Sequence, residues 1–309
     1  MISRRQFLRW FAAFGAVGAL TAAYGIAVEP MLRPRITRYD LRPDRWPAGF
    51  DLTIAVLADI HAGRPWMTPE RINSIVDTTN GLAADLIVLL GDYVVSGRFR
   101  RYFVTEDVAP QAWADALARL RAPLGVHAIL GNHEWWSDPV AQQTWQGPPA
   151  SRGVVESAGI PVYENDAVRL AKNGQAFWLA GLGDQIAFLP SRRLWPGRPY
   201  GVDDLDGTLA KVTDDAPIIL LAHEPDIAVR VPERVSLMLS GHTHGGQVRL
   251  FGWSPIVPSR YGNRFAYGHV RERCDLIVSG GLGCSIFPVR LGVPPEVVVV
   301  ALRGGGKVG

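Results

Sequence analysis

Cysteine is scarce in this 309-residue chain, which contains only Cys274 and Cys284. Two cysteines exclude a small scaffold held together by several disulfides, and their spacing is not that of a zinc knuckle. The sequence leaves open whether they form one bridge or remain two buried thiols.

The chain also has little net charge, little low-complexity sequence and no internal repeat. The formal net charge is +3, and the only low-complexity tract is the short glycine run at residues 304–306. Residues 1–45 contain eight arginines and three acids, which leaves 24 basic and 26 acidic residues in the remainder. The folded part is therefore predicted not to bind nucleic acid. With 48% hydrophobic and 20% charged residues, the chain is expected to fold as one large domain or two small ones.

The N-terminus has the order of an export signal. Residues 3–9 contain paired arginines followed by Phe-Leu, and an uncharged apolar stretch covers residues 10–28. The pattern resembles a twin-arginine signal, by which bacteria export folded proteins; an ordinary membrane anchor is the alternative. The stretch is about long enough to span a bilayer, and Gly25-Ile26-Ala27 is an imperfect cleavage site, so cleavage and retention both stay open. Through the twin-arginine export machinery, the body is expected to reach the periplasm or the outer face of the cytoplasmic membrane.

Four segments are predicted along the chain. Residues 1–29 form the signal or membrane anchor. Residues 30–50, which hold four prolines among arginines, form a linker or a first edge segment. Residues 51–303 form the folded domain, and residues 304–309 form a flexible tail.

Five apolar runs that are typical of buried strands end in residues suited to metal binding or catalysis. The runs cover residues 52–57, 86–90, 125–130, 218–221 and 235–239. After them come Asp59 and His61; Asp92; Asn132, His133 and Glu134; His223; and His242 and His244. Because parallel strands end at one edge of an α/β sheet, these side chains are expected in one cleft. Two imidazoles held close in a glycine turn suit a transition metal.

The segments between these runs are less informative. Helices are expected from residue 68 and over residues 111–121 and 203–212, and a β-hairpin over residues 168–180. Residues 135–153, rich in Trp, Gln, Pro and Gly, are expected to form an irregular cap that either lines a substrate cleft or packs on the domain edge. His127 lies within its strand and is expected to be structural.

Together the five blocks resemble the calcineurin-like metallophosphoesterase family over about residues 51–302, and within it an exported or membrane-associated bacterial branch. The sequences at residues 240–247, 258–262 and 287–290 support that branch. The resemblance implies an α/β fold, a four-layer α-β-β-α sandwich of two packed mixed sheets, with the metal site at the C-terminal ends of the strands. It also implies a metal-dependent phosphoric ester hydrolase in which a metal-bridging hydroxide attacks phosphorus in line.

The family pattern implies a role for each residue of the cleft. The first metal would be held by Asp59, His61 and His244, and the second by Asn132, His223 and His242, with Asp92 bridging them. Mixed nitrogen and oxygen ligands favour Mn, with Fe or Zn as alternatives. His133 would protonate the leaving group or stabilise charge on the phosphoryl group, and Glu134 would either orient His133 or be a structural carboxylate.

One block departs from the Ser/Thr phosphatases of this superfamily. Val95 stands where they carry an acid that pairs with the catalytic histidine, and Ser96 where they carry a phosphate-binding arginine. This difference disfavours phosphoprotein substrates. Arg260, Tyr261 and Arg264 are the substrate-binding candidates instead, although solvent-facing arginines are the more common case.

The expected substrate follows from the N-terminal export signal and from the family branch that the sequence resembles. The membrane address, the aromatic loops and the similarity to a branch that includes UDP-diacylglucosamine hydrolases favour a phosphodiesterase or pyrophosphatase acting on a phospholipid or nucleotide-lipid. The alternatives are a broad-specificity phosphomonoesterase and a non-catalytic scaffold with the same fold. Every ligand position is filled, which disfavours the scaffold.

Overall fold

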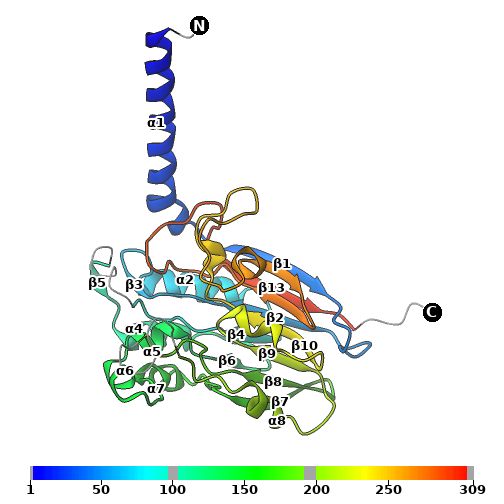
Figure 1. The fold of residues 1–309 in the computed structure, drawn as a ribbon. Coiled ribbons are helices and arrows are strands. Elements are labelled where there is room, and N and C mark those ends of the chain that lie inside the picture. Colours follow the sequence, from blue (N-terminus) through cyan, green and yellow to red (C-terminus); the bar gives the residue numbers. More distant parts are fainter. Residues whose placement is uncertain (1–2, 97–103, 191–199, 305–309) are drawn as a thin grey trace, which may run out of the picture.

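A computed structural model describes residues 3–96, 104–190 and 200–304, so that the predicted tail lies outside the described residues except for Gly304 (Figure 1). The N-terminal segment is one helix that stands away from the body. Helix α1 (Arg4–Ala27) starts at a capping box formed by Ser3 and Gln6, and nearly all of it is exposed. It is long and apolar enough to cross a membrane, a property that signal sequences share.

The foot of α1 is attached to the body by hydrogen bonds. The N–H of Arg290 donates to the carbonyl of Gly25 at 2.8 Å. After a 3-10 turn, η1 (Glu29–Met31), the buried carboxylate of Glu29 accepts from the N–H of Val293 at 2.9 Å. These bonds fix the point at which the helix leaves the body.

Two mixed sheets form the centre of the molecule. The first has the strand order β1 (Arg35–Leu41), β13 (Glu296–Leu302), β2 (Leu52–Leu57), β4 (Leu86–Leu89) and β6 (Val126–Ala128). The second has the order β11 (Gly268–Arg271), β12 (Asp275–Val278), β10 (Val235–Ser240), β9 (Ile218–Leu221), β8 (Gln175–Gly181) and β7 (Asp166–Lys172). The strands β2, β4 and β6 are parallel, as are β8, β9, β10 and β12. A small third sheet pairs β3 (Gly63–Arg64) with β5 (Glu106–Asp107).

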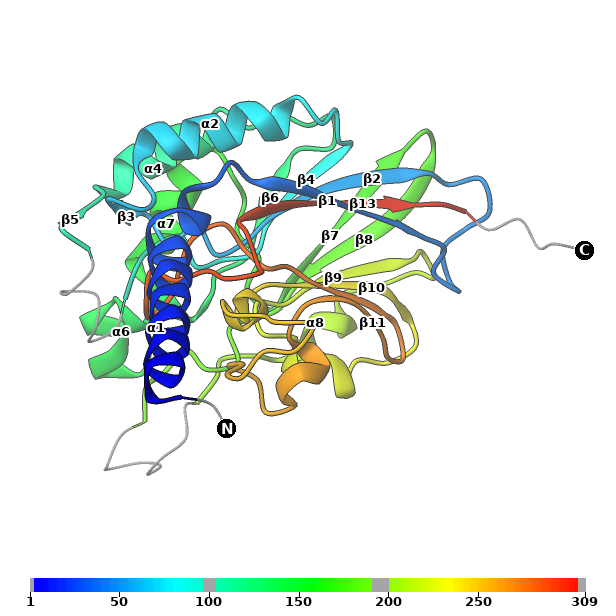
Figure 2. The same cartoon turned by 90° about the horizontal axis from the view of Figure 1, so that it is seen from above.

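The layers follow the predicted α-β-β-α order, which Figure 2 shows edge-on. Apolar side chains from the facing sides of both sheets, such as Ile54, Leu237 and Val300, form the central core. The outer side of the first sheet is covered by α2 (Pro69–Asn80), α4 (Pro110–Leu117) and α7 (Ala150–Ser157). The outer side of the second is covered by α8 (Leu205–Ala210) and the 3-10 helices η2 (Pro225–Val229) and η4 (Gly262–Phe265).

Several local predictions need correction or a choice between alternatives. Of the two interpretations of residues 30–50, the edge segment is the observed one, because β1 pairs in parallel with β13 along its whole length. The helix expected over residues 111–121 ends at Leu117. The hairpin expected over residues 168–180 is confirmed as β7 and β8. Both cysteines are free thiols.

The prediction of an irregular cap over residues 135–153 is wrong, because this segment folds into short helices. These are α5 (Asn132–Trp136), α6 (Pro139–Thr144) and the start of α7. Asp138 caps α6 by accepting from the N–H groups of Val140 and Ala141, and Pro139 occupies its first turn. The tryptophans that suggested a loop pack together instead: Trp135 and Trp145 both contact the ring of Phe188. Aromatic packing therefore orders a segment whose composition is typical of a loop.

Candidate metal centre

The strand ends singled out in the sequence meet at one edge, between the two sheets. The ends of β2, β4 and β6 bring Asp59, His61, Asp92, Asn132 and His133 from the first sheet. The ends of β9 and β10 bring His223, His242 and His244 from the second. All of them are buried except His242, which is partly exposed. The cleft predicted from the parallel-strand rule is present.

The backbone is strained where it presents these side chains. Asp59, His61, Asp92, His242 and His244 have φ angles of 55°, 48°, 57°, 68° and 52°. A positive φ is costly for residues with a Cβ, and such conformations cluster at functional sites. Neighbouring glycines provide the space: a Cβ at Gly131 would lie 2.4 Å from Oδ1 of Asp92, and one at Gly241 would lie 2.7 Å from Oδ2 of Asp59.

The potential ligand atoms form overlapping groups. Within 4.8 Å of one another lie the ligand atoms of Asp59, His61 and His244, those of His61, Asp92 and His133, and those of Asp92, His223 and His242. Oδ2 of Asp92 is 3.2 Å from Nε2 of His223 and 3.6 Å from Nε2 of His61. Asp92 therefore lies between the group that contains His61 and the group that contains His223 and His242.

The donors also satisfy a test of whether metal ions fit there. Nε2 of His61 and Nε2 of His244 are 3.1 Å apart, and Nδ1 of His242 is 2.8 Å from Oδ1 of Asn132. Oδ2 of Asp59 is buried and has no hydrogen-bond partner among the described residues, and Nε2 of His223 has none beyond its approach to Asp92. Buried polar atoms are normally satisfied, so converging, unsatisfied nitrogen and oxygen donors indicate a plausible binuclear site for transition metals.

Hydrogen bonds on the far side of two imidazoles set which nitrogen faces the centre. Nδ1 of His61 lies 3.1 Å from the carbonyl of Val94, and Nδ1 of His223 lies 2.6 Å from the carbonyl of Leu90. A carbonyl can only accept, so Nδ1 carries a proton in each ring and Nε2 is the nitrogen that faces the centre. Burial opposes a charged His223, but the Asp92 carboxylate raises the pKa of His223 well above its usual value, so a metal bound there would displace the proton on Nε2. Burial lowers the pKa of His61 to about 3, which favours the neutral form that binds metals. Burial opposes ionisation of Asp92, but the imidazoles of His223 and His133 hold its pKa well below its usual range.

Glu134 supports the centre in a way that the sequence did not reveal. Its carboxylate does not contact the imidazole of His133; instead it accepts four backbone N–H bonds. Oε2 accepts from Asp92 and Gly131 at 2.8 Å, and Oε1 accepts from Tyr93 at 2.7 Å and Val94 at 3.2 Å. Burial raises the pKa of Glu134, yet four donors aimed at two oxygens leave no acceptor for a carboxyl proton. Glu134 is thus the structural carboxylate of the two alternatives, and it shapes the loop that carries Asp92.

Ser96 holds His133, which was one of the two alternative roles considered for Glu134. The N–H of Ser96 lies 3.0 Å from Nδ1 of His133, and its hydroxyl lies 2.9 Å from the same atom. With a neutral ring, the N–H donates to Nδ1 and the ring proton is on Nε2. With a charged ring, Nδ1–H can donate to the hydroxyl. In both states Nε2–H points towards Ser285, whose Oγ is 3.3 Å away, and towards Asp92.

A cavity of about 390 Å³ opens from this cluster. Its polar end is formed by Ser96, Asn132, His133, His242, His244 and Ser285, and its walls by apolar residues that include Trp136, Ile256, Ile286 and Phe287. The substrate-binding candidates Arg260, Tyr261 and Arg264 do not line it. Arg264 forms a bidentate pair with Glu272, and the backbone N–H of Arg260 donates to Asp226. The volume and the apolar walls with a polar end are typical of small-molecule sites.

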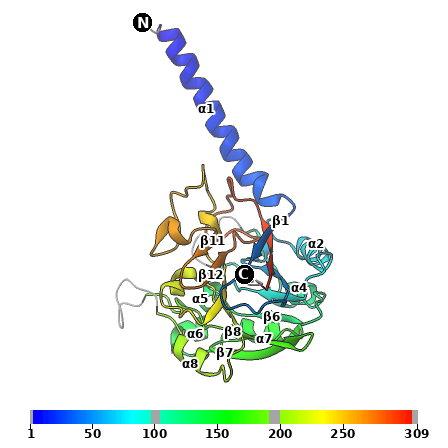
Figure 3. The same ribbon diagram turned by 90° about the vertical axis from the view of Figure 1, so that its right-hand side faces the viewer.

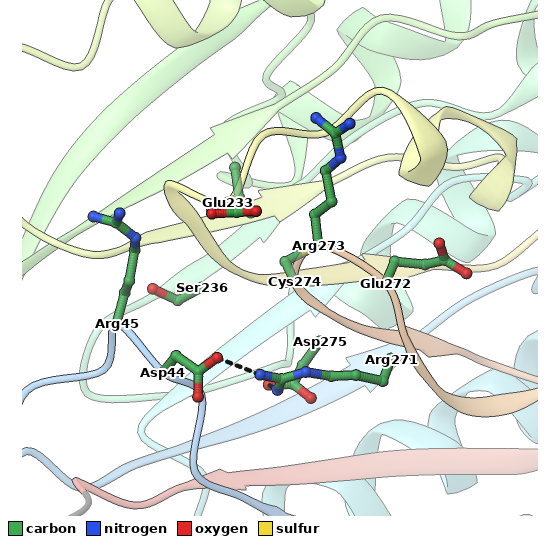
Figure 4. Close-up of a pocket in the computed structure, with 10 residues that line it drawn as sticks. Asp44, Arg45, Glu233, Ser236, Arg271, Glu272, Arg273, Cys274 and Asp275 are labelled. Carbon is green, nitrogen blue, oxygen red and sulfur yellow. Dashed lines mark hydrogen bonds and ion pairs between the residues drawn. The ribbon is translucent and has the colours of Figure 1, made fainter.

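A second, larger cavity lies at the opposite end of β10. It measures about 650 Å³, and Asp44, Arg45, Glu233 and the residues at the start of β12 line it (Figure 4). Three of its charged groups pair with one another: Arg271 contacts Asp44 at 2.5 Å and Asp275 at 2.6 Å. It offers no cluster of histidine ligands among the described residues, so the chemistry belongs to the first cavity.

Comparison with known proteins identifies relatives of the chain. The calcineurin-like phosphoesterase family profile matches residues 52–246, and the twin-arginine translocation signal profile matches residues 1–21. The uncharacterized metallophosphoesterase YkuE of Bacillus subtilis is 31% identical, with 98% of each chain covered. The phosphodiesterase YaeI of Escherichia coli is 30% identical, with 98% of this chain and 100% of YaeI covered. A solved dimetal phosphatase from Danio rerio aligns with a TM-score of 0.42 at 12% identity, over 82% of this chain and 99% of that one.

The family profile spans well over half of the chain, and relatives at 30% identity align along its whole length. The signal at the N-terminus indicates export. The chain therefore belongs to the calcineurin-like phosphoesterase family, and it is an exported, metal-dependent phosphoesterase.

Proposed function

We propose that the protein is a two-metal phosphodiesterase or pyrophosphatase that acts on a lipid-linked phosphoester outside the cytoplasm. One observation carries this proposal: the cavity that begins at the histidine and aspartate cluster continues between apolar walls. A polar phosphoryl group and an apolar chain of one substrate fit the two ends. The relative YaeI, which is named a phosphodiesterase, supports cleavage of a diester.

The residues divide into two sets around Asp92. Asp59, His61 and His244 would hold the first metal, and Asn132, His223 and His242 the second, with Asp92 available to both; the grouping of the ligand atoms supports this division. Bound divalent ions such as Mn, Fe or Zn supply activation of water and neutralisation of charge at phosphorus. Burial and the hydrogen bonds to Val94 and Leu90 keep the imidazoles of His61 and His223 oriented for this binding.

His133 supplies the hydrogen bond on the substrate side. As a water oxygen bonds to phosphorus and the bond to the leaving oxygen breaks, negative charge grows on the oxygens around phosphorus. Nε2–H of His133 faces the cavity and donates to one of them, while Ser96 fixes the ring through Nδ1.

Replacing His133 with alanine is expected to lower kcat by about 10²–10³-fold, the effect of losing one donor to developing charge. The measurement is hydrolysis of bis(p-nitrophenyl) phosphate with Mn, together with the metal content. The metal content should stay at the wild-type value, and His269→Ala, a histidine of β11 paired with Asp275, should leave kcat unchanged. Unchanged turnover in the His133 variant would contradict the role given to it.

Metal ions are expected to stabilise the protein in the absence of any substrate. At a metal concentration of about 100 times Kd, each filled site adds about 2.7 kcal/mol and should raise Tm by roughly 5–10 °C. Thermal melts of the metal-free chain with added Mn, Fe or Zn measure this shift. Calcium should have a smaller effect, because it prefers oxygen ligands to imidazoles. Identical melting with and without each transition metal would overturn the proposed site.

A panel of substrates tests the reaction class. Phosphomonoesters, phosphodiesters and lipid-linked diphosphates are compared in detergent with Mn. The proposal expects the highest kcat/KM for a lipid-linked diester or diphosphate. Preference for soluble monoesters would replace it with a phosphate-releasing monoesterase.

A further inference from the structure

Exposed apolar side chains surround the mouth of the cavity on two segments. One segment follows the histidine turn and carries Leu250, Phe251, Trp253 and Ile256; the other carries Ile286 and Phe287. We call these six residues the apolar rim. Phe251 is fully exposed, Ile256 is 77% exposed and Trp253 is 59% exposed. Contiguous exposed groups of this kind mark a surface that meets another apolar phase.

Backbone hydrogen bonds join the two segments into one unit. The N–H of Arg249 donates to the carbonyl of Leu291, and the N–H of Leu291 donates to the carbonyl of Gln247, both at 2.8 Å. The side chain of Gln247 accepts from the N–H of Ser285 at 2.7 Å and donates to the carbonyl of Phe287 at 3.0 Å. Since Gln247 lies three residues after His244, the rim is attached directly to the metal centre.

The tip of the rim is built to present a large side chain outward. Phe251 and Gly252 form the turn between Leu250 and Trp253, with φ angles of 52° and 82°. A positive φ is unfavourable for phenylalanine, and a fully exposed ring gains no packing inside the chain to offset it. Residues 250–259 and 276–289 contain no charged residue. Moving these segments from water into an apolar environment would therefore remove no charged side chain from water.

The rim and α1 lie on the same end of the molecule. Figures 1 and 3 show the segment of residues 250–260 and the segment before β13 rising beside the foot of α1. The link is direct, because Arg290, three residues after Phe287, donates its N–H to Gly25 of α1. If α1 crosses a bilayer with its arginines inside, its foot and the rim reach the outer surface together.

We propose that the apolar rim inserts into the outer leaflet of the membrane in which α1 is anchored, so that the cavity opens at the bilayer surface and receives a lipid from the leaflet. Ile256, Ile286 and Phe287 belong to both the rim and the cavity wall, which makes one continuous apolar path from leaflet to metal centre. Insertion of about 5–10 Å is typical of such interfacial segments, and tryptophan favours that depth. The lipid substrate rests on the proposed function; the docking of the rim does not.

The docking is tested on the full chain reconstituted in vesicles of phosphatidylethanolamine and phosphatidylglycerol. In a Cys284→Ser background, a Phe251→Cys variant is labelled with an environment-sensitive fluorophore, and Val140→Cys on α6, 65% exposed, serves as the control. The label at residue 251 should be quenched by lipids that carry a nitroxide in the acyl chain and protected from aqueous iodide. The label at residue 140 should show the opposite. Equal access to iodide at both positions would overturn the proposal, as would protection at residue 251 without quenching by the labelled lipids, which would indicate a protein partner.

A second measurement connects docking to turnover. The triple variant Leu250→Ser, Phe251→Ser, Trp253→Ser changes exposed side chains that do not line the cavity. It should lower kcat/KM for phosphatidylglycerol in vesicles by about tenfold or more, and leave hydrolysis of bis(p-nitrophenyl) phosphate unchanged. Equal turnover of the vesicle lipid by both proteins would contradict delivery through the rim. A wild-type chain that cleaves neither compound would refute the phosphodiesterase form of the proposed function, while the quenching measurement still decides the docking.

Discussion

Replacing Asp92 with asparagine is expected to abolish phosphoester hydrolysis, with kcat/KM falling by at least ~10³-fold, because groups that act as one catalytic unit lose their effect together. Oδ2 of Asp92 lies 3.2 Å from His223, 3.6 Å from His61 and 3.9 Å from His133, and Oδ1 accepts from the N–H of His133 at 2.9 Å. No other described carboxylate contacts three imidazoles of the centre. Asparagine keeps the shape of the side chain but removes the negative charge that two neighbouring cations would share.

The metal content separates this explanation from a general loss of structure. In protein equilibrated with Mn, the Asp92→Asn variant should retain fewer metal ions per chain than the wild type, while its circular dichroism spectrum is unchanged. Asp215→Asn is a matched control, since Asp215 is an exposed carboxylate outside the cavity. It should alter neither metal content nor kcat/KM. A variant at residue 92 that keeps both metals and full activity would show that Asp92 does not lie between them.

The fold was largely predictable because most of its central strands correspond to short apolar runs in the sequence. The runs at 86–90 and 218–221 match β4 and β9, both buried on each face, within a residue at either end. Parallel strands that are buried on both faces produce such runs, and their shared exit edge then places the polar residues that follow. The four-layer arrangement came from the family resemblance, and the two mixed sheets confirm it.

The helices of residues 132–157 could not be predicted, for a physical reason. Their order depends on contacts between residues far apart in the chain, such as Trp135 with Phe188 and Gln142 with the carbonyl of Ala187. Similarly, β1 is half exposed and rich in arginine, so its pairing with β13, more than 250 residues later, leaves little trace in local hydrophobicity.

The convergence of the candidate residues was predictable from the sequence, and the groups that hold them in place were not. Ligand types at strand ends were visible in the sequence, and the structure brings all of them together. The roles of Ser96 and Glu134 depend on backbone N–H groups. Every residue except proline has such a group, so these roles could not be recognised from residue types in the sequence. Glu134 did leave one signal: an acid three residues after Gly131, at the start of a short helix, is a capping position.

Replacing Glu134 with glutamine is expected to destabilise the protein by about 3 kcal/mol, although the side chain contacts no ligand atom. An amide has one oxygen, so two of the four backbone N–H groups of Asp92, Tyr93, Val94 and Gly131 would face an NH₂ group. Hydrogen bonds to a charged group contribute about 1.5–3 kcal/mol each, and a buried donor left unsatisfied costs about 1–3 kcal/mol. Tm should fall by roughly 6–12 °C.

The same substitution should weaken metal binding, because Glu134 holds the backbone of Asp92 in its positive-φ conformation. Loss of a partner that orients a ligand typically costs about 10–100-fold in affinity. Titration of the metal-free variant with Mn measures this change, and thermal melting without metal measures the stability separately. Glu156→Gln on α7 is the matched control; its carboxylate pairs with Arg152 at the surface, so its effect should stay within about 1 kcal/mol. If the variant at residue 134 melted like the wild type and bound Mn equally well, the loop of Asp92 would hold its shape without the carboxylate, and the strain at Asp92 would need another source of support.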